Sequence, residues 1–515
     1  MRTGKPRFPR VLGAAALLFL AVSLSAQDGF GFGFGDGTEE AGAGGPAAGG
    51  GGSPVLGGIA SFITGATVHG KAQAKFQVYG QEFESEDRFK NIKLGDLFRG
   101  RIDFKASASN AEALISLNLI PNQEEPVKSL GIHEAYLKAF FGPLNIQGGF
   151  CKLTWGKADS LGPLDVINPL DYSDLSAMTD LEEIKIARPL LHASLKLGAF
   201  TQVEAVFVPW FEGHHFSQRK TDRWTPRLYR ELPDRLGGHI IGMVPPDMQE
   251  QVAGLMAERM DSHEPSLPAT TALEYAQGGA RFTATTGPVD WGVQYYSGFL
   301  PRPAVALNQA GLEAAQQAAA AGLGAGKDLA TVMAGIPLDS LYTIQYNRFH
   351  HIGADYAQVV LGFNLRGELG ANITGDRDGG DGLVYNPSLV WSAGFDRTMP
   401  WGITVNLQIN ESIRLRYNRI GADSLFDTEA ETHPTTTQLT FRTDKKLFGD
   451  KLELKATVIW GIEDMDCYVI PALAWTQGDI VLEVSGGVFG GKDRLGELSQ
   501  YRDNHFVKTL LTYRF

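Results

Sequence analysis

Much of this chain alternates apolar and polar residues with a period of two, and this pattern constrains the fold more than any other feature. Within residues 68–79, Val68 and Phe76 share a register with other apolar or small residues, while Lys71 lies in the polar register. Residues 98–106 place four charged residues at alternate positions. Successive side chains of a strand point to opposite faces, so these stretches predict strands with one polar face. A row of charges on one face requires water on that side of the sheet.

Beyond residue 26 the sequence contains no apolar run of about 18 residues, so we expect no membrane-spanning helix in the mature chain. Strands can cross a bilayer only when they close into a barrel, because closure gives every backbone N–H and C=O group a hydrogen-bond partner within the sheet. Alternation also accounts for the mean hydropathy of -0.11. We therefore predict an all-β fold: a transmembrane antiparallel β-barrel of about 18 strands (roughly 16 to 18), formed by residues 65–515.

Connections of two kinds alternate along the predicted barrel. Short turns are expected near residues 109–110, 142–143, 198, 287–288, 361–362, 399–400, 449–450 and 477–478. Longer connections are expected near 80–95, 121–130, 156–188, 211–271, 299–341, 374–383, 417–432, 462–466 and 489–504. Alternation of this kind is typical of short periplasmic turns and long extracellular loops. Helix-like stretches at 248–260 and 307–321 are expected to cap or constrict the pore.

The N-terminus has the layout of a secretory signal peptide. Basic residues up to Arg10 precede the apolar run 11–24, which closes at Ala26. We therefore predict a signal peptide over residues 1–26, cleavage near Ala26 and a location in the outer membrane of a diderm bacterium. Residues 27–64 are rich in glycine and too poor in branched apolar residues to bury a core, so we expect a flexible periplasmic tail. Docking of its Phe-Gly repeat on a partner is the alternative.

The last residues form an alternating segment that ends on an aromatic side chain. Val507, Leu511, Tyr513 and Phe515 share its apolar face. The segment resembles the C-terminal assembly signal of bacterial outer-membrane barrels, whose terminal Phe is read by the barrel-insertion machinery. An ordinary edge strand is the alternative interpretation.

A distinctive motif follows the expected strand near residue 150. Its residues are Trp155, Asp159, Asp165, Asn168, Pro169 and Asp171. With its Trp-Gly and Asp-Val-Ile-Asn-Pro-Leu-Asp segments, this stretch resembles a porin-like family of bacterial outer-membrane barrels of uncharacterised function, distantly similar to alginate-export-type barrels. Asn168-Pro169 favours a turn that neighbouring aspartates can cap, so we expect an ordered loop folded into the pore mouth. A constriction or ligand-contacting loop is compatible with this.

Charged residues on the polar faces are expected to line the pore. They are Lys71, Lys75, Arg99, Arg101, Asp103, Lys105, Arg366, Glu368, Arg414, Arg416 and Lys455. Because rings of Arg and Lys favour anions, we predict an anion-biased lumen, although the chain carries a net charge of -12. Charge pairing across strands is an equally good account of these residues. The acidic balance argues against nucleic-acid binding.

Together these features predict a porin-like channel for passive passage of small solutes. Its expected partners are outer-membrane lipid, the insertion machinery and an unidentified solute, and a homo-oligomer is compatible with the sequence. Plugged transport or export of hydrophobic molecules and surface adhesion are the alternatives. No Gly-x-Ser-x-Gly or His-Glu-x-x-His motif occurs, so we expect no catalysis, cofactor or metal. Cys151 and Cys467 lie far apart in the barrel and are expected to be free thiols.

Overall fold

The structure is a computed structural model that describes residues 66–80, 97–122, 129–159, 161–178, 181–220, 222–242, 244–261, 263 and 265–515. The expected signal peptide and the Gly-rich tail lie outside the described residues and stay predictions.

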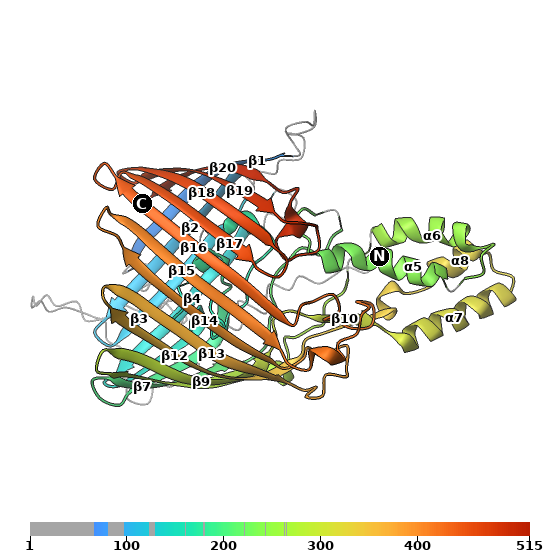
Figure 1. The fold of residues 1–515 in the computed structure, drawn as a ribbon, viewed down its shortest axis with the longest axis horizontal. Helices are drawn as coiled ribbons and strands as arrows, with labels where there is room; N and C mark the ends of the chain where they lie inside the picture. The colour runs from blue at the N-terminus through green and yellow to red at the C-terminus, as the bar shows by residue number, and fades with distance from the viewer. Residues whose placement is uncertain are drawn as a thin grey trace, which may run out of the picture.

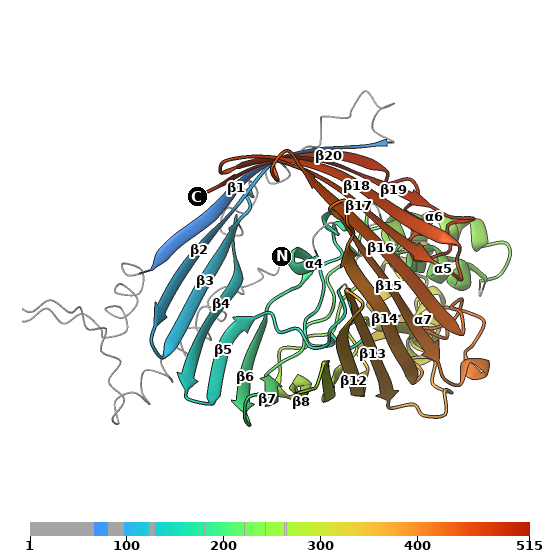
Figure 2. The same cartoon turned by 60° about the vertical axis from the view of Figure 1, so that its left-hand side comes forward.

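Eighteen antiparallel strands form one closed sheet (Figures 1 and 2). The first half contains β1 (Thr67–Tyr79), β2 (Phe98–Ala108), β3 (Ala111–Leu119), β4 (Leu130–Phe141), β5 (Leu144–Cys151), β6 (Arg188–Lys196), β7 (Thr201–Val208), β8 (Gln277–Thr286) and β9 (Val289–Phe299). The second half contains β12 (Arg348–Val360), β13 (Phe363–Thr374), β14 (Ser388–Thr398), β15 (Ile403–Arg414), β16 (Thr435–Leu447), β17 (Leu452–Gly461), β18 (Asp466–Gln477), β19 (Ile480–Gly490) and β20 (Phe506–Arg514).

Each barrel strand pairs with the next one along the chain, β9 pairs with β12, and β20 pairs back with β1. At this seam the register joins Lys71 to Arg514 and Tyr79 to Phe506. Closure leaves the sheet without a free edge, so its backbone groups are satisfied inside the sheet. The predicted all-β barrel and its strand number are confirmed.

Short turns and long loops alternate around the barrel as the sequence predicted. Each expected turn falls between two consecutive strands, and Gly142, Gly287 and Gly478 occupy turns with φ of 62°, 59° and 59°. Positive φ carries no steric penalty for glycine, which is why such residues are favoured in tight hairpins. We call the barrel end with these turns the turn end and the opposite one the loop end. The first residues of β1 and the last residues of β20 lie at the turn end.

The outer face of the barrel is apolar and the inner face is polar. Large apolar side chains such as Leu369, Leu482 and Val507 alternate outward, with 60%, 41% and 51% of their surface exposed. Residues of the opposite register, among them Glu368 and Lys508, are buried. An apolar outer band around a polar interior is the arrangement of a transmembrane β-barrel.

A group of helices projects beyond the loop end, to the right in Figure 1. It contains α5 (Arg227–Gly242), α6 (Gln249–Asp261), α7 (Gln309–Gly324), α8 (Leu329–Ala334) and the hairpin β10–β11 (Ala304–Leu307, Tyr342–Gln345). Tyr229, Leu236, Val252, Met256 and Leu341 belong to its buried core. The helix-like stretches predicted near 248–260 and 307–321 correspond to α6 and α7, whereas α5 and α8 were not anticipated. These helices pack on one another beyond the loop end, so they do not constrict the barrel from inside, and capping of the pore stays a prediction.

None of the helices in the described part of the chain is long and apolar enough to cross a membrane. Both cysteines are free: Cys151 is buried at the end of β5, and Cys467 lies on β18.

Candidate functional site: a loop that crosses the lumen

The connection between β5 and β6, residues 152–187, turns into the barrel, and we call it the inward loop. Figure 2 shows its short helix α4 (Leu181–Ile184) within the ring of strands. It also contains a single 3₁₀ turn, Leu175–Ala177. Residues 160, 179 and 180 lie outside the described part of the chain. The position of the inward loop, which its contacts with the barrel fix, determines how much of the lumen stays open.

The root of the inward loop is held by the predicted Asn-Pro motif. The Asn168 side chain accepts the N–H of Leu153 at 2.8 Å and donates to the carbonyls of Cys151 and Ile186. Trp155, 1% exposed, packs edge-on against Tyr296 of β9. These contacts clamp the two ends of the loop together beside the strands that it connects.

Two aspartates and the proline of the motif also stabilise the loop. Asp165 forms an ion pair with Lys185 at 2.9 Å, and both side chains are almost fully buried. Asp171 accepts the N–H of Ser173, and the carbonyl of Pro169 accepts the N–H of Ile186. The motif therefore holds the loop in an ordered conformation, and a contact between the motif and a ligand stays a prediction.

The first arm of the inward loop, near residues 156–165, docks on β13 and β15. The Glu368 carboxylate accepts the backbone N–H groups of Lys157, Ala158 and Leu164 at 2.5, 2.7 and 3.2 Å. A Cβ at Gly156, whose φ is 100°, would lie 2.3 Å from Oε1 of Glu368. Glycine is therefore required at this close approach.

Asp159 extends the same arm to the neighbouring wall. Its carboxylate contacts the guanidinium of Arg366 and accepts from Asn406 Nδ2 at 2.7 Å. Arg366 also pairs with Asp396 of β14 at 2.8 Å. A lumen-facing cation of the wall thus finds its counter-charge partly on the inward loop.

The second arm, near residues 172–184, docks on the seam of the barrel. Asp174 pairs with Lys75 of β1 at 3.5 Å, and the carbonyl of Ser176 accepts from Lys508 of β20 at 2.8 Å. Glu183 on α4 contacts Lys71 of β1 at 2.9 Å and Arg101 of β2 at 2.6 and 3.0 Å. In the strand order, β13 lies nearly opposite the seam, and β15 is five strands away from β20. The inward loop is therefore a strut across the lumen.

The strut covers some strands and leaves others open to the lumen. On β12 the inward-facing His351 and Asp355 are 0% and 4% exposed, and alternate residues of the strand are buried. On β2 and β4, by contrast, every residue keeps part of its surface accessible, although Leu114 and Ser116 of β3, which lies between them, are 8% and 2% exposed. We call the lumen beside β2 and β4 the open sector. The inward loop reaches its border at Arg101 of β2 and Tyr136 of β4, and it leaves the residues of both strands partly accessible.

Basic residues concentrate on adjacent strands at the edge of the open sector. We call Lys71, Lys75, Arg99, Arg101 and Lys508 the basic stripe. Two carboxylates of the inward loop face it, Asp174 and Glu183. Burial raises the pKa of Glu183, but hydrogen bonds from Arg101 and Lys71 outweigh this and lower its pKa to about 2. Because cations outnumber the facing carboxylates, the stripe retains positive charge.

The other predicted pore-lining residues are spread around the wall. Asp103 accepts a hydrogen bond from Ser116, and Lys105 lies exposed toward the turn end of β2. Lys455 pairs with Glu453 at 3.0 Å. Such contacts agree with the alternative of charge pairing within the wall, and a selectivity role for these residues stays a prediction.

Two arginines near the loop end differ in their placement. Arg414, the last residue of β15, pairs with Glu429 at 3.0 Å. Arg416 is exposed in the loop that follows, with a φ of 57°, so its predicted position on a strand is wrong. Strand β15 ends at Arg414, two residues before the last charged residue that the sequence pattern had assigned to it.

The partners of the basic stripe were missed by sequence reasoning. Glu183 and Asp174 lie on the inward loop, and no local pattern tells which carboxylate of a long loop reaches the wall. His133 was missed as well, although its Nδ1 lies 3.4 Å from Nη2 of Arg101, and Nζ of Lys152 lies 3.4 Å from its Nε2. The polar register of the strand near residue 133 was the only available signal.

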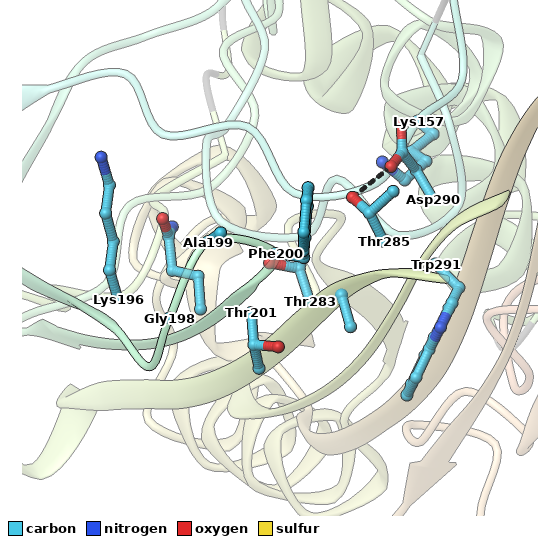
Figure 3. Close-up of a pocket in the computed structure, with 12 residues that line it drawn as sticks. Lys157, Lys196, Gly198, Ala199, Phe200, Thr201, Thr283, Thr285, Asp290 and Trp291 are labelled. Carbon is cyan, nitrogen blue, oxygen red and sulfur yellow. Dashed lines mark hydrogen bonds between the residues drawn. The ribbon is translucent and has the colours of Figure 1, made fainter. Parts of the chain in front are cut away.

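A small cavity of about 260 Å³ opens near the turn end, beneath the first arm of the inward loop (Figure 3). Lys157 from the loop, Lys196, Phe200 and Trp291 contribute to its lining. Thr285 donates a hydrogen bond to Asp290 at its edge, at 2.5 Å. The cavity therefore joins the inward loop to the turns between β6 and β7 and between β8 and β9.

No protein-family profile and no curated protein matches this chain. The resemblance of its motifs to alginate-export-type barrels therefore stays a prediction.

Solved structures with similar folds include outer-membrane proteins. Wzi from Escherichia coli, described as a carbohydrate-binding β-barrel involved in group 1 capsule assembly, has 10% identity and a TM-score of 0.43, over 90% of this chain and 88% of that one. The outer-membrane protein opdK from Pseudomonas aeruginosa has 8% identity and a TM-score of 0.44, over 88% and 100%. The outer-membrane channel DcaP of Acinetobacter baumannii has 9% identity and a TM-score of 0.37, over 87% and 97%. At these values the functions of those proteins do not transfer to this chain.

Proposed function

We propose that this chain is a porin-like channel of the bacterial outer membrane, through which small solutes pass along the open sector. The observation that carries the proposal is the contrast between β12, whose inner face is buried under the inward loop, and β2 and β4, whose inner faces stay accessible. Wide barrels of about 16 to 18 strands leave room for an aqueous path. The turn end would face the periplasm, and the helices at the loop end would face the medium.

We further propose that the path favours anions. The basic stripe borders the open sector. The carboxylates near it are Asp174 and Glu183 of the inward loop and Glu483 of β19, which are fewer than the five cations. Like-charged rings of Arg and Lys lower the barrier for anions and raise it for cations. The charge of the whole chain is set largely elsewhere and does not decide this local field.

Single-channel recording of the refolded protein in a planar bilayer tests both parts. We expect steady openings and, in a KCl gradient, a reversal potential whose sign indicates a preference for Cl⁻ over K⁺. Arg101→Gln should shift that potential toward the cation side, whereas Lys492→Gln, an exposed residue outside the barrel strands, should leave it nearly unchanged. A correctly folded barrel without openings would refute the channel. A reversal potential that indicates a preference for K⁺ would refute the anion bias.

Surface adhesion is a second candidate, because α5 to α8 form a cluster with its own core beyond the loop end. Binding of the refolded protein to bacterial or host cell surfaces in the absence of conductance would favour it. The charged border of the open sector speaks against a path for hydrophobic molecules. The proposed passage requires no catalysis and no cofactor.

A further inference from the structure

The barrel residues Arg101 and Lys71 hold the carboxylate of Glu183 in the way that a binding site holds the carboxylate of a ligand. Both of its oxygens contact the Arg101 guanidinium, Oε1 to Nη1 at 3.0 Å and Oε2 to Nη2 at 2.6 Å, and Oε1 also accepts from Lys71 at 2.9 Å. A planar guanidinium that engages both oxygens is the geometry by which arginine recognises a carboxylate. The wall therefore presents a formed carboxylate site that a residue of the inward loop occupies.

The wall holds this site in place independently of Glu183. Asn118 of β3 accepts from Nε of Arg101 at 3.0 Å and so orients the guanidinium from behind. Arg101 and Lys71 lie directly opposite each other in the pairing of β1 with β2. Both cations belong to strands of the barrel, so they stay in position when the loop moves.

Glu183, in contrast, is carried by a short element and remains accessible. It lies on α4, and 33% of its side chain is exposed, against 15% for Arg101. His133 and Lys152 continue the polar network behind Arg101. A solute in the open sector can therefore approach the carboxylate and the cations that hold it.

From this geometry we propose that Arg101 and Lys71 form a binding site for a carboxylate group of the permeating solute, and that Glu183 fills this site until a solute carboxylate displaces it. The inference rests on the proposed channel and names its substrate class. The exchange is non-covalent and conserves charge at the site. A neutral solute cannot replace Glu183, because two cations would then lose their counter-charge.

Displacement explains why the site holds its own carboxylate. A tethered group competes at an effective concentration in the millimolar range, so it keeps the cations paired when the lumen is empty and yields when solute accumulates. Removing the tethered competitor should strengthen solute binding by about tenfold, the factor that applies when the effective concentration of Glu183 is about ten times the dissociation constant of a free carboxylate at the same cations.

Isothermal titration calorimetry of the refolded full-length protein with succinate tests the proposal. We expect succinate to bind, its neutral diamide not to bind, and Glu183→Gln to bind succinate about tenfold more tightly. Arg101→Gln should lose at least about tenfold in affinity, since it removes a charge-assisted bidentate contact. Lys492→Gln is the matched control for loss of one positive charge and should bind like the wild type.

Unchanged or weaker binding to Glu183→Gln would overturn the proposal, and so would equal binding to Arg101→Gln and the wild type. Heat-modifiable migration on gels establishes that each variant is folded. Recording the same samples in bilayers separates the two claims. Succinate binding by a silent barrel would refute the channel alone, and an open channel without succinate binding would refute the carboxylate site alone.

Discussion

Single lumen-facing residues decide how this barrel is partitioned. Glu368 gathers three backbone N–H groups of the first arm, and Arg101 binds the carboxylate of the second. Their positions on the polar face follow from alternation, which assigns every second side chain of a strand to the lumen. The partners of these residues do not follow from alternation, because they belong to a loop that starts at β5.

The pH dependence of the Glu183 contact is one prediction at this scale. Its pKa of about 2 lies below the ordinary value of 4.5, so the docked carboxylate stabilises the contact fully above about pH 4.5 and progressively less as the pH falls toward 2. We expect the difference in reversal potential between wild type and Glu183→Gln to stay constant from about pH 7 to 5 and to fall to about half near pH 2, where half of the Glu183 carboxyls are protonated. A difference that disappears already near pH 5 would contradict the assigned pairing. The variant serves as the control for other titrating carboxyls.

Gly70 carries a second residue-scale prediction. The backbone of Phe515 pairs with Gly70 in both directions, at 2.8 and 3.0 Å, and a Cβ at Gly70 would lie 2.6 Å from both the carbonyl oxygen of Arg101 on β2 and the Phe515 ring. The terminal aromatic ring thus packs over a glycine of β1 at the closing seam. We expect Gly70→Val to reduce the folded, heat-modifiable fraction severalfold, because the seam cannot close around the added carbons.

Gly131→Val is the matched control, since a Cβ there meets no atom within 4 Å. Equal folding yields of the two variants would show that the close packing of Gly70 against Arg101 and Phe515 does not contribute to assembly. Recognition of Val507, Leu511, Tyr513 and Phe515 by the insertion machinery stays a prediction. Their outward exposure, about half of each side chain, leaves that face available for contact.

Among the elements, the inward loop has the largest effect on the lumen. Its sequence motif predicted an ordered loop at the pore mouth, and Asn168 and Trp155 contribute to this order. The length of the excursion was not predictable, because it depends on wall residues contributed by β1, β2, β13 and β20. Strands far apart in the chain become adjacent or opposite only once the barrel closes.

Excision of the inward loop tests its role as a strut. Replacing residues 156–184 with a short Gly-Ser linker should raise the single-channel conductance severalfold, because conductance increases with the cross-section of the path. The pairing of β5 with β6 is kept, so we expect the barrel to fold. Replacing α7 with a linker of the same kind is the control and should leave the conductance nearly unchanged, since α7 lies beyond the loop end (Figure 1). Equal conductance of wild type and loop-deleted protein would contradict the strut.

At the scale of the whole molecule, the apolar outer band is the feature that assigns the protein to a membrane. Trp460 and Trp475 lie in this band and are 44% and 41% exposed, whereas Trp224, 5% exposed, packs inside an aromatic cluster near the loop end. The band follows from the sum of many alternating strands, and no single strand would establish it.

Quenching by brominated lipids tests the band. In liposomes with brominated acyl chains we expect strong quenching of the wild-type tryptophan fluorescence. The double variant Trp460→Phe, Trp475→Phe should lose a large part of the quenchable fluorescence. Trp224→Phe should lose only fluorescence that the lipids do not quench. Equal loss of quenchable signal in both variants would place the membrane boundary elsewhere.

Local pattern was sufficient for the strands, the alternation of turns and loops, and the inner position of residues such as Lys71 and Arg101, because strand periodicity is a property of the backbone that each segment carries alone. The error at Arg416 arose where the strand ended and the pattern continued by chance. Only the closed barrel decided where Glu183 docks on the seam and which N–H groups of the inward loop reach Glu368. It also decided the position of the open sector. Each of these features brings together residues that are far apart in the sequence. Their proximity in space is set only when the first and last strands pair and the barrel closes.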